Sequence, residues 1–364
     1  MALTLVASLA TPAAAISPSP QAMPEFNGSV YAIAFLGDAV YVGGSFTTVL
    51  TGDRTYTRQR LAAFDARTGA LLDWQPSTNG TVRALVAAGG DVYAAGDFTD
   101  VSGVRRDSLA RIDAATGDLG SLSHRISGTA YALALAGGRL YLGGRFSAVD
   151  GTHRGNLAAF ALADGMLDDR WLPSADNAVH TLATYGSRVY LGGAFRHVDG
   201  VTGAQHIAAV DAADGTLDPD FLAPAVAQVN GIVADTSGVY VATGGRGGHA
   251  IALSTTGQVY WQRVFDGDAV AIARLDGVTY VGGHFDRACL TPSNGPHGVC
   301  TGVSRPRVKL AAIDAAGVLS SWAPQANGVI GVRVIAANPI GTIAAGGDFT
   351  TMGGRERLHY ASFG

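Results

Sequence analysis

The sequence VYVGGSFTTV, at residues 40–49, decides the fold of this chain. Valine and tyrosine favour a β-strand, yet Gly43 and Gly44 stand inside it, where glycine weakens a strand. The stretch recurs: VYAAGDF ends at Phe98, LYLGGRF at Phe146, VYLGGAF at Phe195, TYVGGHF at Phe285 and IAAGGDF at Phe349. VYVATGG, at residues 239–245, is a degenerate copy without the phenylalanine. Seven units of roughly 50 residues are typical of a propeller or a solenoid.

Each unit contains four strand-like runs and no helical periodicity. In the second unit these runs are TVRALVAAG, DVYAAGDF, SLARIDAATG and DLGSLSH. The sequence therefore predicts an all-β fold, a seven-bladed β-propeller of four-stranded antiparallel blades. We expect the paired glycines to lie on the second strand near the axis, where neighbouring sheets converge, and Phe46 to fill the wider gap beside them.

The two ends of the chain are predicted to close the ring. The last unit stops at LHYASFG, after its third strand. AMPEFNG, at residues 22–28, matches WQPSTNG at residues 74–80 and WAPQANG at residues 322–328 in its Pro, Asn and Gly. Residues near 17–24 are thus expected to supply the missing strand of the seventh blade and remove an exposed sheet edge. Residues 16–364 then form a single domain.

Composition and the N-terminus favour an exported protein. Only 15% of the 364 residues are charged and the net charge is −4, which gives no footprint for nucleic acid. Residues 1–15 resemble a signal peptide, and the lack of a basic residue before the apolar run indicates a truncated or misassigned start. A disordered alanine-rich terminus is the alternative. No later apolar run approaches the roughly 18 residues of a membrane span. A secreted, monomeric protein is the prediction.

The two cysteines support the same compartment. Cys289 and Cys300 flank a loop rich in proline, glycine and asparagine. In an oxidising compartment such a pair predicts a disulfide, and two cysteines supply too few ligands for a typical zinc site. No metal and no cofactor are expected.

The repeated units resemble a known family. YVGGSFT, RLAAFDARTGALLDWQPSTNG and TVRAL, in repetition, resemble the delta-60-repeat propellers of secreted bacterial proteins, a domain family of unknown function. The resemblance covers nearly all of the chain after residue 20 and implies a propeller and export, but no reaction. AAFDARTGALLDW is also similar to the docking motif of quinoproteins, with one extra residue before Trp74. Kelch-type propellers share the Gly-Gly after an apolar strand.

A recurring aspartate is predicted to be structural. It precedes short turns at four places, Asp65, Asp113, Asp211 and Asp314, and is replaced by Ala161 and Ser254 in two other units. An aspartate side chain can cap backbone N–H groups in such a turn, and interchange with Ala or Ser suits a turn better than a catalytic acid.

The connections between the second and third strands are long, whereas the other turns are minimal. Long loops on a rigid scaffold concentrate binding residues, so this face is the predicted working face. Strand one begins there with a variable residue in each unit: Tyr31, Arg83, Tyr131, His180, Asn230, Ala271 and Arg333. Converging on the axis, these side chains could bind a carboxylate, a phosphate or a sugar. The alternative is that they only satisfy water and backbone groups in a channel.

A second variable position lies between Gly-Gly and Phe, and it holds Ser45, Asp97, Arg145, Ala194, His284 and Asp348. Arg145 is counted with the ligand-binding candidates of the first set. Asp97 and Asp348, assisted by His284 or His180, could form an acid/base pair in a hydrolase or lyase. Ion pairs of Asp97 with Arg145, or of Asp348 with Arg83, are the ordinary alternative.

No familiar catalytic motif accompanies the repeat. The leading hypothesis is a module that binds a small polar molecule, a glycan or an extracellular protein on the long-loop face. An exported propeller enzyme and a purely structural cell-surface module are the alternatives. An open axial pocket with Asp or His within reach of Arg would favour the enzyme, and a plugged channel would favour the other two.

Overall fold

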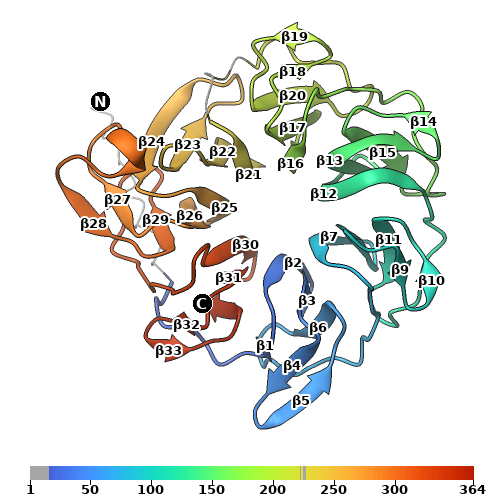
Figure 1. Ribbon diagram of the computed structural model, residues 1–364, viewed down its shortest axis with the longest axis horizontal. Coiled ribbons are helices and arrows are strands. Elements are labelled where there is room, and N and C mark those ends of the chain that lie inside the picture. Colours follow the sequence, from blue (N-terminus) through green and yellow to red (C-terminus); the bar gives the residue numbers. More distant parts are fainter. Residues whose placement is uncertain (1–15, 222, 224–226) are drawn as a thin grey trace, which may run out of the picture.

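In the computed structural model, residues 16–221, 223 and 227–364 are described, and the predicted signal peptide at residues 1–15 lies outside them. Seven radial antiparallel sheets of these residues surround a central axis, and we call each sheet a blade (Figure 1). The innermost strands are β2 (Val30–Leu36), β7 (Val82–Ala88), β12 (Ile126–Ala136), β16 (Val179–Tyr185), β21 (Val229–Asp235), β25 (Ala269–Leu275) and β30 (Val332–Asn338).

Each innermost strand pairs with a middle strand, and each middle strand pairs with a third strand. The middle strands are β3 (Ala39–Gly44), β8 (Asp91–Gly96), β13 (Arg139–Val149), β17 (Arg188–Gly193), β22 (Gly238–Thr243), β26 (Val278–Gly283) and β31 (Thr342–Gly347). The third strands are β6 (Leu61–Asp65), β11 (Leu109–Asp113), β15 (Leu157–Ala161), β20 (Ile207–Asp211), β23 (His249–Leu253), β29 (Leu310–Ile313) and β34 (Tyr360–Phe363).

The predicted fourth strand is mostly reduced to a single bridge. Leu71 bridges Phe64 and Leu119 bridges Ile112, and neither extends into a strand. Proline, glycine and aspartate, which disfavour strands, interrupt these runs. The fifth blade is the exception, because VYWQRVF forms β24 (Val259–Phe265) along the edge of β23. The unit whose glycine motif is degenerate therefore has the longest fourth strand.

The long connections between the second and third strands fold into hairpins or extend the middle strand. They are β4 (Thr48–Thr51) with β5 (Arg54–Thr57), β9 (Asp100–Val101) with β10 (Val104–Arg105), the end of β13 with β14 (Thr152–His153), β18 (His197–Val198) with β19 (Val201–Thr202), β27 (Arg287–Cys289) with β28 (Ser304–Pro306), and β32 (Thr351–Met352) with β33 (Arg355–Glu356). The link that enters a blade bridges its hairpin, as in Thr78 with Val101. This places the interblade links on the predicted long-loop face.

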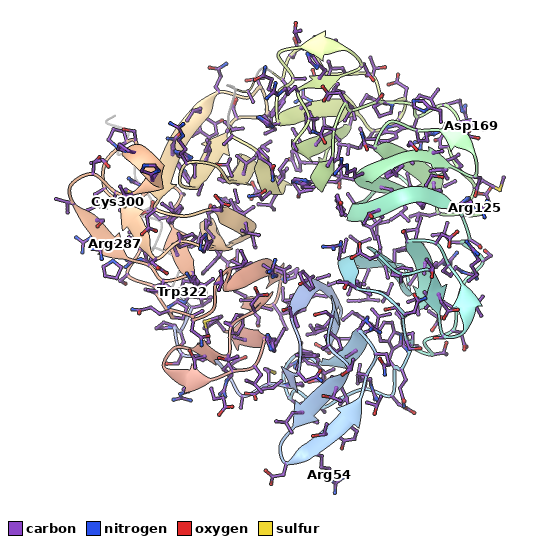
Figure 2. All side chains as sticks on the ribbon, viewed as in Figure 1. Arg54, Arg125, Asp169, Arg287, Cys300 and Trp322 are labelled. Atoms are coloured by element: carbon purple, nitrogen blue, oxygen red, sulfur yellow. A yellow bond between two sulfur atoms is a disulfide. The ribbon has the colours of Figure 1, made fainter. Side chains whose placement is uncertain are left out.

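The Cys289–Cys300 disulfide is present, as predicted. It closes the loop between β27 and β28, which contains the short 3₁₀ helix η1 (Pro296–Gly298). Through β27 this hairpin pairs with β24 and extends the fifth blade to a six-stranded sheet. Figure 2 shows Cys300 near the outer rim, away from the axis. The disulfide thus staples a peripheral loop.

The first glycine of the repeated motif lies at the contact between neighbouring blades. A Cβ on Gly43 would lie 2.5 Å from Cγ1 of Val82, on the next innermost strand. The second glycine has a different constraint, because a Cβ on Gly44 would overlap the Ser29 carbonyl of its own blade. The predicted close approach of neighbouring sheets therefore applies to the first glycine only. Phe46 is buried and packs on Phe26, with ring centroids 4.6 Å apart.

The size of the residue facing the first glycine varies with it. Five junctions pair glycine with valine: Gly43 with Val82, Gly143 with Val179, Gly192 with Val229, Gly282 with Val332 and Gly346 with Val30. Two blades carry alanine at the glycine position, and there the next strand carries alanine in place of valine: Ala95 with Ala130 and Ala242 with Ala269. Each junction is filled by two or three side-chain carbons in total.

Tryptophan side chains form further contacts between neighbouring blades. The indole Nε1 of Trp74 donates to the carbonyl of Asp113 in the next blade (2.9 Å), and Trp171 donates in the same way to Asp211 (3.1 Å). The Asp113 carboxylate meanwhile accepts two amides of its own turn, as predicted for these aspartates. Its carbonyl and its side chain thus have separate structural tasks.

The N-terminal segment takes the place of that turn at the ring closure. The Trp322 indole of the sixth blade donates to the Ser17 carbonyl (3.4 Å), and the Gln21 amide donates to Ser362 on β34 (2.8 Å). Residues 17–24 pack on the last blade without forming a strand, and the first strand, β1 (Glu25–Phe26), pairs with β4 in the first blade. The segment therefore contacts both blades that flank the seam.

Among the described residues, no helix is long and apolar enough to cross a bilayer.

We predict that Ala130→Val destabilises the fold because it overfills a junction that already contains Ala95. Overpacking of this kind costs about 1–3 kcal/mol. Ala95→Gly in the same chain should restore most of the loss by recreating the glycine–valine pair. Urea unfolding of both single variants and the double variant gives the coupling energy. Additive changes in the free energy of unfolding would contradict the proposed matching of residue sizes across the junction.

We predict that deletion of residues 16–27 unfolds or aggregates the protein, because it removes the segment that joins the first and last blades. Thermal unfolding followed by circular dichroism, with light scattering, measures this. Deletion of residues 1–15 alone is the control and should leave the melting temperature unchanged. An unchanged melting temperature after deletion of residues 16–27 would refute the role of this segment in ring closure.

Candidate functional site

An axial cavity opens among the first residues of the innermost strands. In each blade the pairing of the innermost with the middle strand skips one residue, a β-bulge. A bulge leaves the extra residue unpaired and re-aims its side chain. The seven bulge residues, which we call the polar ring, line the cavity: Tyr31, Arg83, Tyr131, His180, Asn230, Val270 and Arg333.

The structure thus brings together six of the seven residues predicted at the first variable position. The sixth blade is the correction, because its bulge falls on Val270, whereas Ala271 pairs with Gly282. The bulge explains the difference, since Ala269 and Ala271 are the paired residues of β25 and Val270 is skipped between them.

Two arginines of the polar ring are held by aspartates of their own blades. Nε of Arg83 lies 2.8 and 2.9 Å from the two carboxylate oxygens of Asp97, and its Nη2 lies 2.6 Å from Oδ2. Nε and Nη2 of Arg333 lie 2.5 and 2.8 Å from the oxygens of Asp348. Both pairs are fork-like, which fixes the guanidinium planes. The predicted pairs Asp97–Arg145 and Asp348–Arg83 are therefore wrong.

These ion pairs set the charges at the open end of the axial cavity. We call this end, lined by the polar ring and Arg145, the mouth. The hydrogen bond to Asp97 raises the pKa of Arg83. Burial acts to raise the pKa of Asp348, but hydrogen bonds from Arg333 and from the Ser29 hydroxyl outweigh it and lower that pKa. Asp348 is accordingly a charged acceptor whose oxygens are already occupied, an arrangement that suits positioning better than proton transfer.

Aromatic rings lie beside the same arginines. The Arg83 guanidinium lies 5.7 Å from the Tyr131 ring centroid, and that of Arg333 lies 5.1 Å from the Tyr31 centroid. Tyr131 and His180 meet edge to face at 5.9 Å. Burial lowers the pKa of His180, so the imidazole is neutral at physiological pH. The mouth therefore combines guanidinium groups, tyrosine faces and a neutral histidine.

The second variable position contributes unevenly. Arg145 and Ala194 line the upper cavity, about 480 Å³ in volume, together with residues of the polar ring. Asp97 faces an adjoining pocket with Arg105 and Arg125. Of the four predicted catalytic residues, His180 lines both axial cavities, whereas Asp97, Asp348 and His284 line neither.

Arg145 is the unpaired cation of the mouth. It lies on the exposed side of β13, opposite Thr129. Within residues 16–221, 223 and 227–364, no carboxylate lies within 4.0 Å of its guanidinium, and no side-chain hydrogen bond holds it. Its charge is therefore available to a ligand.

Sequence reasoning missed several residues of the mouth. Asn177 and Gln228 line the upper cavity, and Asp268 lines an adjoining pocket with Asn230 and His180. Gln228 and Asp268 each stand two residues before a bulge residue, immediately before the innermost strand of the blade. That repeat position was the available signal, but its other occupants are mostly small or apolar.

Below the polar ring the cavity narrows between aliphatic side chains. One comes from each blade, two residues after the bulge, and we call this set the aliphatic ring: Ile33, Leu85, Leu133, Leu182, Ile232, Ile272 and Ile335. All seven retain 6–8% exposure, whereas Val30 and Val82, which fill the blade junctions, have none. The lower cavity they line has a volume of about 260 Å³.

The described residues contain no group of three or more His, Cys, Asp or Glu side chains that could hold a metal ion. The chemistry of the mouth is that of arginine, amide and hydroxyl hydrogen bonds.

A family model described as outer membrane protein assembly factor BamB matches residues 21–263. The chain belongs to this family. No curated protein matches it. The match runs from the N-terminal segment into β24 and so covers the first four blades and part of the fifth of this BamB-family chain. The delta-60-repeat resemblance stays a prediction.

Solved structures show the same fold at low sequence identity. The WD40 β-propeller domain of Doa1 superposes with a TM-score of 0.61 and 11% identity over 95% of this chain and 96% of that one. The computationally designed Ika8 protein gives a TM-score of 0.51 and 14% identity over 95% and 99%. The BamB-family chain is thus a β-propeller, as the repeat predicts.

We predict that His180 makes stability fall with acidification. Because burial lowers its folded pKa below the unfolded value, the unfolded chain binds the proton more readily, and stability is lost as pH falls below about 6.5. Urea unfolding between pH 7.5 and 5.5 should show a shallower loss for His180→Gln than for the wild type. Burial also lowers the pKa of His249, so the His180→Gln variant should keep a residual dependence of stability on pH. Identical slopes would contradict the assignment.

Proposed function

We propose that this chain is a seven-bladed β-propeller, closed by its N-terminal segment, that acts as an extracytoplasmic binding module. Its ligand is a small polar molecule with a carboxylate or phosphate group, bound at the axial mouth on the long-loop face. The BamB-like family and the Cys289–Cys300 disulfide are consistent with an oxidising, extracytoplasmic compartment. A signal peptide at residues 1–15 belongs to the same proposal.

The unpaired guanidinium of Arg145 carries this proposal. Arg83 and Arg333 each bind an aspartate through Nε and Nη2. Nη1 of each therefore has no partner among the described residues. An anion at the mouth would gain charge-assisted hydrogen bonds from Arg145, and Tyr131 offers a face for a planar group. Neutral His180 adds a hydrogen bond without adding charge. A glycan or an extracellular protein as partner stays a prediction.

An exported hydrolase or lyase is the second candidate. The observation that favours it is an aspartate within hydrogen-bond distance of an arginine at an axial pocket, at Asp97 and at Asp348. Against it, both carboxylates already accept guanidinium hydrogen bonds, and His284 stands apart from the cavity. Turnover of glycosides or carboxylic esters by the wild type, abolished in Asp348→Asn, would support the enzyme over the binding module.

We predict that Arg145→Gln weakens anion binding about tenfold or more, the effect of one charged hydrogen bond. Isothermal titration with acetate, inorganic phosphate and glucuronate measures it, and crystals soaked in the same anions locate the density. Arg54→Gln removes the same charge from an exposed residue on the outer rim, labelled in Figure 2, and should leave affinity unchanged. Binding of none of these anions, or equal binding by both variants, would overturn the proposal.

A further inference from the structure

The aliphatic ring is more than the floor of the mouth. Its side chains are two residues beyond the polar ring on the same strands, roughly 6–7 Å deeper at the usual rise of a strand. They retain a uniform exposure of 6–8% because seven strands around an axis cannot bring their side chains into full contact. The exposed part of each side chain faces the lower cavity.

The lower cavity is large enough for an apolar group. Its volume of about 260 Å³, which includes the part lined by the polar ring, exceeds the roughly 150 Å³ in which an apolar cavity accommodates benzene. The polar ring lines it above and aliphatic carbons line it below, so its chemistry changes from charged to apolar along one axis. A ligand that is polar throughout would leave this lower surface unused.

We infer that the axial cavity binds an anionic amphiphile, a molecule with a carboxylate or phosphate head and one short acyl chain or single aromatic ring. The head contacts Arg145 in the upper cavity, which Arg83 and Arg333 also line, and the apolar part enters the aliphatic ring. Burial of the tail removes apolar surface from water on both partners, which adds affinity without further hydrogen bonds. This inference rests on the proposed anion site and specifies the class of its ligand.

A chain-length series tests the inference. The probes are acetate, butyrate, hexanoate and octanoate, titrated calorimetrically into the full chain at concentrations below micelle formation. We expect affinity to rise up to about fourfold per methylene, from the transfer free energy of a buried CH₂, and to level off when the lower cavity is full. The heat capacity change should become more negative along the series.

Two variants separate the contribution of the anionic head to affinity from that of the apolar tail. Leu182→Phe places a larger side chain in the lower cavity and should reduce the affinity for octanoate while leaving that for acetate unchanged. Arg145→Gln should weaken every member of the series by a similar factor. Circular dichroism checks that both variants fold, and if Leu182→Phe does not, the wild-type series still decides.

The outcomes distinguish this inference from the proposed function. Equal, Arg145-dependent affinity for acetate and octanoate overturns the amphiphile and leaves the anion site standing. Octanol binding as tightly as octanoate overturns the inference, because it removes the need for an anionic head. Binding of no carboxylate and no inorganic phosphate overturns the anion site and the inference together.

Discussion

Every junction between neighbouring blades depends on one contact, between a small residue of a middle strand and the residue just before the bulge on the next innermost strand. Five junctions combine glycine with valine and two combine alanine with alanine, so the gap always receives a similar amount of carbon. Close-packed interiors tolerate little change in volume, which explains why the two positions vary together. This contact sets how closely each blade approaches the next, and therefore the width of the cavity around the axis.

The polar ring follows from the same contact. In the first blade, Val30 is fixed by its junction and Ala32 pairs with Gly43, so the residue between them is bulged out of the ladder. Tyr31 therefore takes part neither in the strand pairing of its blade nor in the packing of the junction, and its side chain faces the axis. The repeat can change this residue without disturbing the sheet. The closely packed junctions and the variable residues that face the axis are thus two results of one strand geometry.

Much of this architecture could be predicted from the repeat, because glycine spacing and strand propensity are local signals. The sheets, the disulfide, the turn aspartates and six of the seven axial residues belong to that part. The sixth axial residue was misplaced because a bulge is invisible in an apolar stretch such as AVAIA, where either Val270 or Ala271 fits the pattern. The fourth strands were overestimated because a strand-like run does not reveal how few ladder bonds it forms. Ion-pair partners depend on side-chain reach, which spacing alone does not give.

The charges of the mouth nevertheless follow a rule that acts within each blade. Two positions approach one another at the axis, the bulge residue and the residue after the second glycine. The second blade combines Arg83 with Asp97, the seventh combines Arg333 with Asp348, and both pairs are closed ion pairs. The third blade combines Tyr131 with Arg145, so the second position carries a cation and the first carries no carboxylate to match it. Arg145 therefore has no carboxylate at the matching position of its own blade, and among the described residues no carboxylate lies within 4.0 Å of its guanidinium.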